Sequence, residues 1–336
     1  MQITDLKNLT LHTGGERILW IDICKTIAIY FIVISHASYT NTTISDFLFS
    51  FHVASFFFIS GVLDKSGKMP MTEWVKKQII TLVIPYYLWN FVVLLCGTYT
   101  WKYCIAFLLG LVNPNSASWF IKYLILFKLV IYLFESRQLK SILGGCFIIG
   151  LILIVDAIRL HNNLDFSVPF SMKVVFACFP FYMGGKLFSQ SIVKIGTFVS
   201  MHKELAFGGS LFFAFIQFLL FKFLPYTHSS SIAVLAENPI LYWITGFNGF
   251  FALMFLSSLI AILLKNSNRW IVNISSGTLF IMCTHYELMR FLLSKIQPEN
   301  DIVILVFCSL YFIVQVYLLP IVLRYCPILA GRKRII

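Results

Sequence analysis

Charged residues are scarce in this sequence: they make up 12% of its 336 residues, whereas 59% of the residues are hydrophobic. A soluble globular protein carries about 25% charged residues, so this composition excludes that class. Long apolar runs take the place of charge, and about 20 such residues suffice for a helix to cross the hydrocarbon core of a bilayer. The sequence therefore predicts an all-α integral membrane protein with about ten transmembrane helices.

Motifs for metals, nucleotides and nucleic acids are also missing. The eight cysteines form no CxxC pair and no Cys/His spacing typical of a metal site, so we predict no metal. No P-loop and no GxGxxG motif follows a strand, and no internal repeat favours an inverted-repeat transporter. The formal net charge of +12 does not predict a nucleic-acid partner, because no basic run is interleaved with aromatic residues in a soluble segment.

Hydrophobic runs and turn signals together predict the position of each span. The spans lie near 18–38, 44–63, 77–97, 117–134, 141–159, 169–188, 204–224, 240–264, 272–293 and 301–323. The apolar segment 101–112 is too short to cross and is predicted to be interfacial or re-entrant. Lys and Arg concentrate in alternate loops, which places both termini in the cytoplasm. We expect a cytoplasmic N-terminal segment (1–16), a membrane domain (17–324) and a basic cytoplasmic tail (325–336).

One predicted span carries ionisable residues within an apolar run. Asp22, Lys25 and His36 lie in the first span, and ionisable groups in hydrocarbon are costly. At about 100° per residue, Lys25 and His36 are about 20° apart around the helix axis, with Asp22 within about 60° of either. We expect this face to line a protein interior or a wet passage from Lys25 to His36. The alternative is an Asp22–Lys25 ion pair at the membrane edge with His36 at the far interface.

The predicted orientation brings further polar side chains to similar depths. His52 of the second span and His285 of the ninth lie in the outer half with His36, and Glu287 follows His285. Trp119 and Lys122 begin the fourth span on the same side. Any one of these histidines alone would more often be a hydrogen-bonded core residue, but three from different helices indicate a functional site.

The cytoplasmic segment 64–85 is rich in lysine. Lys76 and Lys77 lie shortly before Pro85, which we expect to stop or bend the third span. Such a cluster is either a loop that obeys the positive-inside rule or a site for a phosphorylated cofactor from the cytosol.

These residues resemble the motifs of one family. Arg17, Asp22, Lys25 and His36 fit a pattern like R-x4-D-x2-[RK]-x10-H, and FSFHVASFFFISG (49–61) is similar to a second motif. KKQIITLVIPYY, Trp119-Phe120-Ile121 and the late Ser276, Phe280 and His285 resemble three more. The chain thereby resembles the acyltransferase 3 family of membrane O-acyltransferases, in particular its fucose 4-O-acetylase and polysaccharide O-acetyltransferase branch. Lys76 and Lys77 stand where the family often has arginine.

The resemblance implies transfer of an acetyl or other acyl group from cytosolic acetyl-CoA to a sugar hydroxyl of a surface glycan or its lipid-linked precursor. We expect Lys25, with Arg17, Lys76 and Lys77, to bind the acyl-CoA donor, and Asp22 to pair with Lys25 or Arg17. His36 is the expected general base, because a neutral imidazole takes up a proton near physiological pH. His285 is the expected second catalytic residue, as one that orients the acceptor or stabilises the oxyanion. The substrate-binding residues expected are His52, Trp119, Lys122 and Glu287.

Two other functions fit the same pattern. A transporter or flippase for a glycan or lipid-linked sugar would use a similar aromatic and polar cavity without a reactive thioester, and an assembly subunit would use the polar stripe only to join helices. The partners expected are the acyl-CoA donor, the glycan or lipid-linked acceptor and the lipid bilayer of the cell (inner or plasma) membrane. The sequence leaves homo-oligomer formation open.

Overall fold

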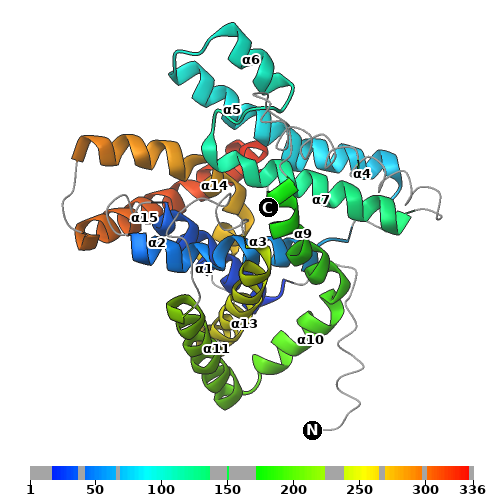
Figure 1. The fold of residues 1–336 in the computed structure, drawn as a ribbon, viewed down its shortest axis with the longest axis vertical. Coiled ribbons are helices and arrows are strands. Elements are labelled where there is room, and N and C mark those ends of the chain that lie inside the picture. The colour runs from blue at the N-terminus through cyan, green and yellow to red at the C-terminus, as the bar shows by residue number, and fades with distance from the viewer. Residues whose placement is uncertain are drawn as a thin grey trace.

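The structure, a computed structural model, describes residues 17–36, 42–65, 69–136, 150, 172–223, 238–264, 269–296 and 301–332. These ranges contain helices and no strand (Figure 1). In chain order the helices are α1 (Leu19–Ser35), α2 (Thr42–Phe49), α3 (His52–Val62), α4 (Met71–Gln78), η3 (Ile79–Val83), α5 (Ile84–Cys96), α6 (Trp101–Leu108), η4 (Ser116–Ser118), α7 (Trp119–Ser136), α9 (Met172–Leu187), α10 (Ser189–Val199), α11 (Lys203–Phe223), α13 (Pro239–Leu264), α14 (Arg269–Ile296), α15 (Asp301–Tyr325) and η5 (Pro327–Ala330).

Helix α1 lies at the centre of the bundle, where it packs against α3, α13 and α14 (Figure 1). Its apolar residues are buried on more than one side; Ala28, Ile29 and Val33 have no exposed surface. A helix buried in this way keeps its polar residues out of lipid, because they contact neighbouring helices.

The second span is broken at Ser50 and Phe51, between α2 and α3. The hydroxyl of Ser50 donates a hydrogen bond to the Phe47 carbonyl oxygen (2.6 Å), and the backbone of Phe51 leaves the helical region. As a result, His52 is the first residue of α3 and lies at the same end of the bundle as the C-terminal end of α1.

Pro85 does not stop the third span. Stopping it was one of the two outcomes expected from the sequence, the other being a bend. The π-helical segment η3 precedes it, so that α4, η3 and α5 form one continuous helical stretch from Met71 to Cys96. Proline lacks an N–H and crowds the preceding turn, and a wider π-turn accommodates both effects. Because a π-turn inserts extra backbone, it also changes which side chains face the bundle.

Two glycines allow α3 and α9 to approach closely. A Cβ atom added to Gly61 would overlap the carbonyl oxygen of Tyr182, and one added to Gly185 would overlap that of Phe58. Small residues are typical of such membrane helix crossings. This crossing fixes the C-terminal half of α3, which lines the cavity described below.

Large apolar side chains cover the outside of the bundle. Helix α11 exposes Phe207, Leu211, Phe215 and Phe218, which form one stripe along the helix. Exposed apolar surface of this extent indicates contact with lipid.

Of the described residues, six stretches are long and apolar enough to cross a membrane. Helices α1, α9 and α14 overlap further predicted spans without meeting that criterion. The predicted span 141–159 falls outside the described residues, apart from Gly150. Within the segment 101–112, the structure forms the short helix α6, which extends from one end of the molecule (Figure 1). The protein is a multi-pass membrane protein; the count of about ten helices, the domain boundaries and the placement of both termini stay predictions.

Candidate active site

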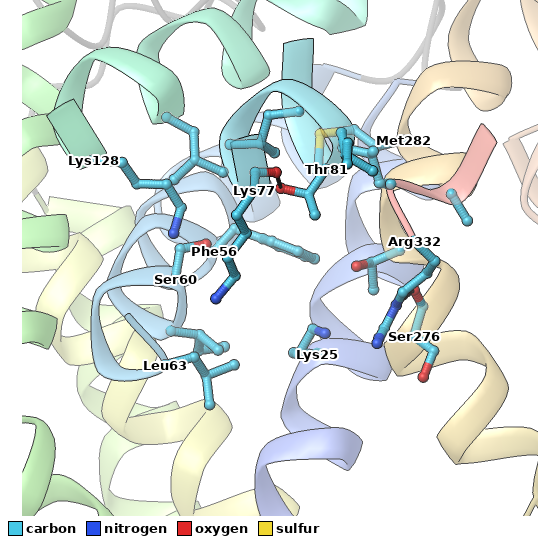
Figure 2. Close-up of a pocket in the computed structure, with 18 of the residues that line it drawn as sticks. Lys25, Phe56, Ser60, Leu63, Lys77, Thr81, Lys128, Ser276, Met282 and Arg332 are labelled. Carbon is cyan, nitrogen blue, oxygen red and sulfur yellow. Dashed lines mark hydrogen bonds between the residues drawn. The ribbon is translucent and has the colours of Figure 1, made fainter. Parts of the chain in front are cut away.

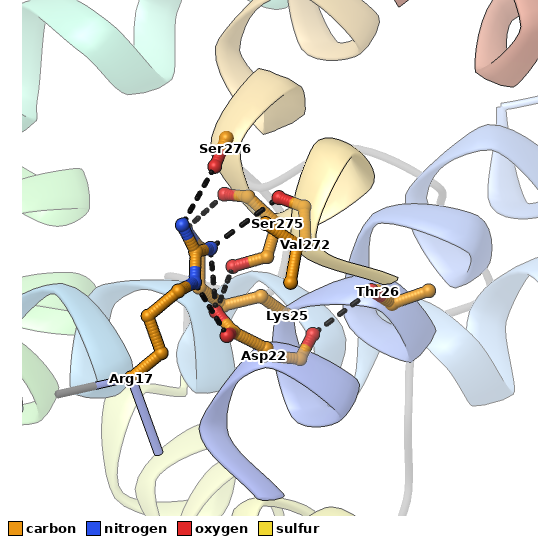
Figure 3. A network of polar contacts seen from close by, with 7 residues as sticks. All are labelled: Arg17, Asp22, Lys25, Thr26, Val272, Ser275 and Ser276. Carbon is orange, nitrogen blue, oxygen red and sulfur yellow. Dashed lines mark hydrogen bonds and ion pairs between the residues drawn. The ribbon is translucent and has the colours of Figure 1, made fainter. Parts of the chain in front are cut away.

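An ion pair and several hydrogen bonds fix the start of α1 to α14 (Figure 3). Arg17 donates from Nε and Nη2 to the two carboxylate oxygens of Asp22, at 2.9 and 3.1 Å. It also donates from Nη1 to Ser276 Oγ (3.1 Å), while Ser275 Oγ donates to Asp22 Oδ1 (2.5 Å). Asp22 therefore pairs with Arg17, which is one of the two expected partners, and not with Lys25.

Lys25 contacts α14 directly. Its Nζ donates to the backbone carbonyl oxygen of Ser275, so the ammonium group lies inside the bundle and not in lipid. Asp22 and Ser275 hold the two helices together one turn from Lys25, and this fixes the position of the lysine.

Lys25 lines a cavity of about 830 Å³ (Figure 2). The cavity lies between α1, α3, α7, α14, the α4–η3 segment and the C-terminal turn. Its lining includes five basic residues and one acidic residue: Lys25, Lys76, Lys77, Lys128 and Arg332, against Glu73. Lys76, Lys77 and Glu73 are exposed, so the cavity opens to the surface beside them. A polyanion fits such a lining.

One of these lysines has a carboxylate partner. Lys128 Nζ lies 3.5 Å from Asp64 Oδ1, and Asp64 Oδ2 accepts a hydrogen bond from the Tyr182 hydroxyl (2.7 Å). Asp64 therefore compensates the charge of Lys128, and positive charge still prevails among the described residues that line the cavity.

Three histidines meet at the opposite end of α1. The ring centroids of His36 and His285 are 5.0 Å apart, and His36 also lies 5.2 Å from Tyr286. His52 joins this group through Phe49, whose ring contacts both His36 (5.2 Å) and His52 (4.8 Å). The structure therefore brings together the three histidines that the sequence placed at one depth.

Backbone hydrogen bonds orient two of the imidazoles. His285 Nδ1 lies 2.8 Å from the Met282 carbonyl oxygen and 3.1 Å from that of Ile281, and His52 Nδ1 lies 2.5 Å from that of Leu48. A carbonyl oxygen only accepts, so Nδ1 carries the proton in both rings and Nε2 carries the lone pair. Nε2 of His285 is buried, and it has no hydrogen-bond partner in the part of the chain that the structure describes. This nitrogen can accept a proton or a hydrogen bond from a bound hydroxyl.

A buried apolar layer separates the cavity from the histidines. Phe56 on α3 and Met282 on α14 are the lining residues closest in sequence to His52 and His285, and Phe120 of α7 packs against Phe56. Met282 is three residues from His285, about 4.5 Å of helix rise. The cavity lining includes neither His36 nor His285, so the cavity does not reach the histidines as the expected passage from Lys25 to His36 would.

The remaining predicted residues lie away from the cavity. Arg17 is committed to Asp22 and Ser276 and does not line it. Trp119 packs against Phe57, Phe120 and Tyr123, and Lys122 Nζ donates to the Gly110 carbonyl oxygen (3.3 Å). Glu287 Oε1 accepts from the backbone N–H of Ser116 (3.2 Å). Glu287 thereby joins α14, which carries His285, to η4, the short helix directly before α7.

Several residues of the site were not foreseen from the sequence. Ser275, Lys128 and Arg332 line the cavity, yet none belongs to a motif named above. The apolar spacing of α7 places Lys128 two turns after Phe120 on one face, which is a signal that sequence reasoning could have used. Among the described residues, no group of three or more His, Cys, Asp or Glu side chains could hold a metal ion.

The profile of the family described as Acyltransferase domain (Acyl_transf_3) matches residues 18–320. No curated protein and no solved structure shows significant similarity to the chain. Together with its apolar helices, this match makes the protein a membrane acyltransferase. The chain belongs to the acyltransferase 3 family.

Proposed function

We propose that this protein is an O-acetyltransferase of the cell membrane that moves an acetyl group from cytosolic acetyl-CoA to a sugar hydroxyl of a surface polysaccharide or its lipid-linked precursor. The observation that carries the proposal is a basic cavity at one end of α1, with a histidine cluster at the other end of the same helix.

The donor binds in the cavity. Its phosphate groups interact with Lys76 and Lys77 at the opening, and its pantetheine arm extends past Lys25 toward the apolar layer. The 11 residues from Lys25 to His36 span about 16 Å, which is comparable to an extended pantetheine arm. Arg17 acts indirectly, because it holds Asp22 and thereby the contact between α1 and α14.

The histidines provide the chemistry. His36 is the general base: it takes the proton of the sugar hydroxyl as the oxygen attacks the thioester carbonyl carbon. The carbon–sulfur bond then breaks, and the proton passes to the departing thiolate to give CoA-SH. His285 Nε2 carries a lone pair and not a proton, so it orients the acceptor by accepting a hydrogen bond from a neighbouring hydroxyl of the sugar and does not stabilise the oxyanion in its neutral form.

The acceptor approaches from the histidine end. In this proposal Trp119 stacks on a sugar ring, and His52, Lys122 and Glu287 are the other residues that bind the acceptor. Positive-inside orientation places this end outward, where surface glycans are assembled.

Mass spectrometry of surface glycans from cells with and without the protein tests the proposal. We expect acetyl esters only in cells that make it, and release of CoA-SH from acetyl-CoA by the purified protein in nanodiscs when acceptor is present. Vectorial movement of a sugar or lipid-linked sugar without any use of acetyl-CoA would instead make the protein a transporter or flippase.

The His36→Ala variant tests the base. We expect the variant to transfer acetyl groups on the order of 100-fold more slowly or worse, because it lacks the general base. His202→Ala is the matched control, because His202 is exposed and lies far along the chain from the cluster. Full activity in a correctly folded His36→Ala protein would contradict the assignment.

A further inference from the structure

The chain turns back into the bundle after its last long helix. The short helix η5 follows α15, and Trp89 Nε1 donates a hydrogen bond to the Leu329 carbonyl oxygen (3.0 Å). Gly331 then adopts φ +67°, a left-handed conformation that favours glycine. A Cβ atom at Gly331 would also overlap the carbonyl oxygen of Thr81 in the π-helical segment. The turn therefore fits against η3 only with glycine at this position.

This turn places Arg332 in the lining of the cavity. Its Nε donates to the backbone carbonyl oxygen of Ser276 (3.3 Å), which anchors the side chain on α14 beside Lys25 (Figure 2). Burial, and then the nearby charge of Arg17, lower the pKa of Arg332 from its ordinary value, and the charge of Asp22, which is itself paired with Arg17, opposes this shift in part. A guanidinium group nevertheless remains protonated at neutral pH.

The rest of the guanidinium group is available for a ligand. Within the described ranges, Arg332 makes no ion pair with a carboxylate, and its two Nη groups have no hydrogen-bond partner. A partly buried cation of this kind is costly unless a counter-charge accompanies it. The two Nη groups form the fork that binds phosphate oxygens in a bidentate manner.

We propose that Arg332, presented by the turn at Gly331, binds phosphate groups of the donor in this cavity. This inference rests on the proposed function, since it assigns a phosphate contact to the same donor. Arg332 lies beyond residues 18–320, which the family profile matches, so this contact is supplied by a C-terminal segment outside the matched domain. Lys77 and Lys25 flank the same space and add charge without the planar geometry of a guanidinium (Figure 2).

Equilibrium binding to the full-length protein in nanodiscs tests the proposal. The probes are acetyl-CoA and S-acetylpantetheine, which has the same thioester and pantetheine arm but no nucleotide phosphates. We expect Arg332→Ala to weaken the binding of acetyl-CoA at least tenfold and to leave that of S-acetylpantetheine unchanged. Arg332→Lys should retain part of the affinity, and Gly331→Val should reproduce the loss because the turn no longer docks.

Arg324→Ala is the matched control, since Arg324 is exposed near the end of α15 and does not line the cavity. A thermal unfolding curve for each variant establishes that it is folded. If the wild type binds acetyl-CoA and a folded Arg332→Ala protein binds it equally well, the inference is overturned while the proposed function stands. If the wild type binds neither thioester, or binds only a polyprenyl diphosphate in the nanodisc, the acetyl-CoA donor is overturned and the inference with it.

Discussion

At the scale of single residues, Asp22 is the centre of the polar contacts that hold α1 to α14. It accepts hydrogen bonds from Arg17 and from Ser275 and is itself buried. A hydrogen bond to a charged group contributes about 1.5–3 kcal/mol, and the exposure of Arg17 favours the lower end of that range.

We therefore expect Asp22→Asn and Arg17→Gln each to lower the free energy of unfolding, by about 1.5 kcal/mol. A double-mutant cycle measured by thermal unfolding in detergent should give a double variant little worse than either single one. Strictly additive losses would show that the two side chains do not depend on each other.

Sequence reasoning reached some residues of the site and missed others for a physical reason. Helical periodicity and the free-energy cost of ionisable groups in hydrocarbon were enough to predict that Lys25 lies inside the protein and that His36 lies near His285. The sequence predicts only a basic cytoplasmic tail for Arg332, because its entry into the cavity depends on the left-handed turn at Gly331 and on Thr81. Gly331 and Thr81 are 250 residues apart in the chain, and a contact between such distant segments leaves no local pattern in the sequence.

At the scale of elements, the layer between cavity and histidines is formed by single side chains of α3, α7 and α14. Phe56, Phe120 and Met282 are buried, and the Phe56 and Phe120 ring centroids lie 6.0 Å apart. The acyl group must pass or occupy this layer to reach His36, so the layer should set the acyl length that the protein accepts.

Met282→Ala should therefore raise kcat/KM for propionyl-CoA relative to acetyl-CoA, on the order of tenfold, which is the low end of the effect of one methylene in an apolar pocket. Phe218→Ala is the control, because Phe218 is exposed on α11. An unchanged ratio in the Met282 variant would place the acyl group elsewhere.

The positions of the helices followed from the apolar runs, but their internal irregularities did not. The break at Ser50 and Phe51 and the π-turn at Ile79–Val83 arise from side-chain hydrogen bonds and from Pro85, which act against a continuous apolar pattern. Helix α10 was not expected, since 189–199 is short and mixed in polarity.

At the scale of the whole molecule, the proposal depends on orientation. The cavity opening with Lys76 and Lys77 must face the cytosol, and the histidine end must face outward. Positive charge in alternate loops predicts this arrangement.

Two native cysteines test it. Cys96, at the end of α5, and Cys326, just after α15, are exposed. In proteins whose other cysteines are replaced by alanine, a membrane-impermeant maleimide added to intact cells should label Cys96 and spare Cys326. The reverse labelling pattern would show that the cavity opens outward, and it would exclude cytosolic acetyl-CoA as the donor.

The central claim is that Lys25 serves donor binding while His36 serves the chemical step, at opposite ends of one helix. The most direct measurement is the affinity for acetyl-CoA together with the rate of acetyl transfer in Lys25→Ala and His36→Ala proteins. We predict that Lys25→Ala weakens acetyl-CoA binding, whereas His36→Ala binds acetyl-CoA like the wild type and transfers no acetyl group. Wild-type affinity in the Lys25 variant, or wild-type transfer in the His36 variant, would contradict the account.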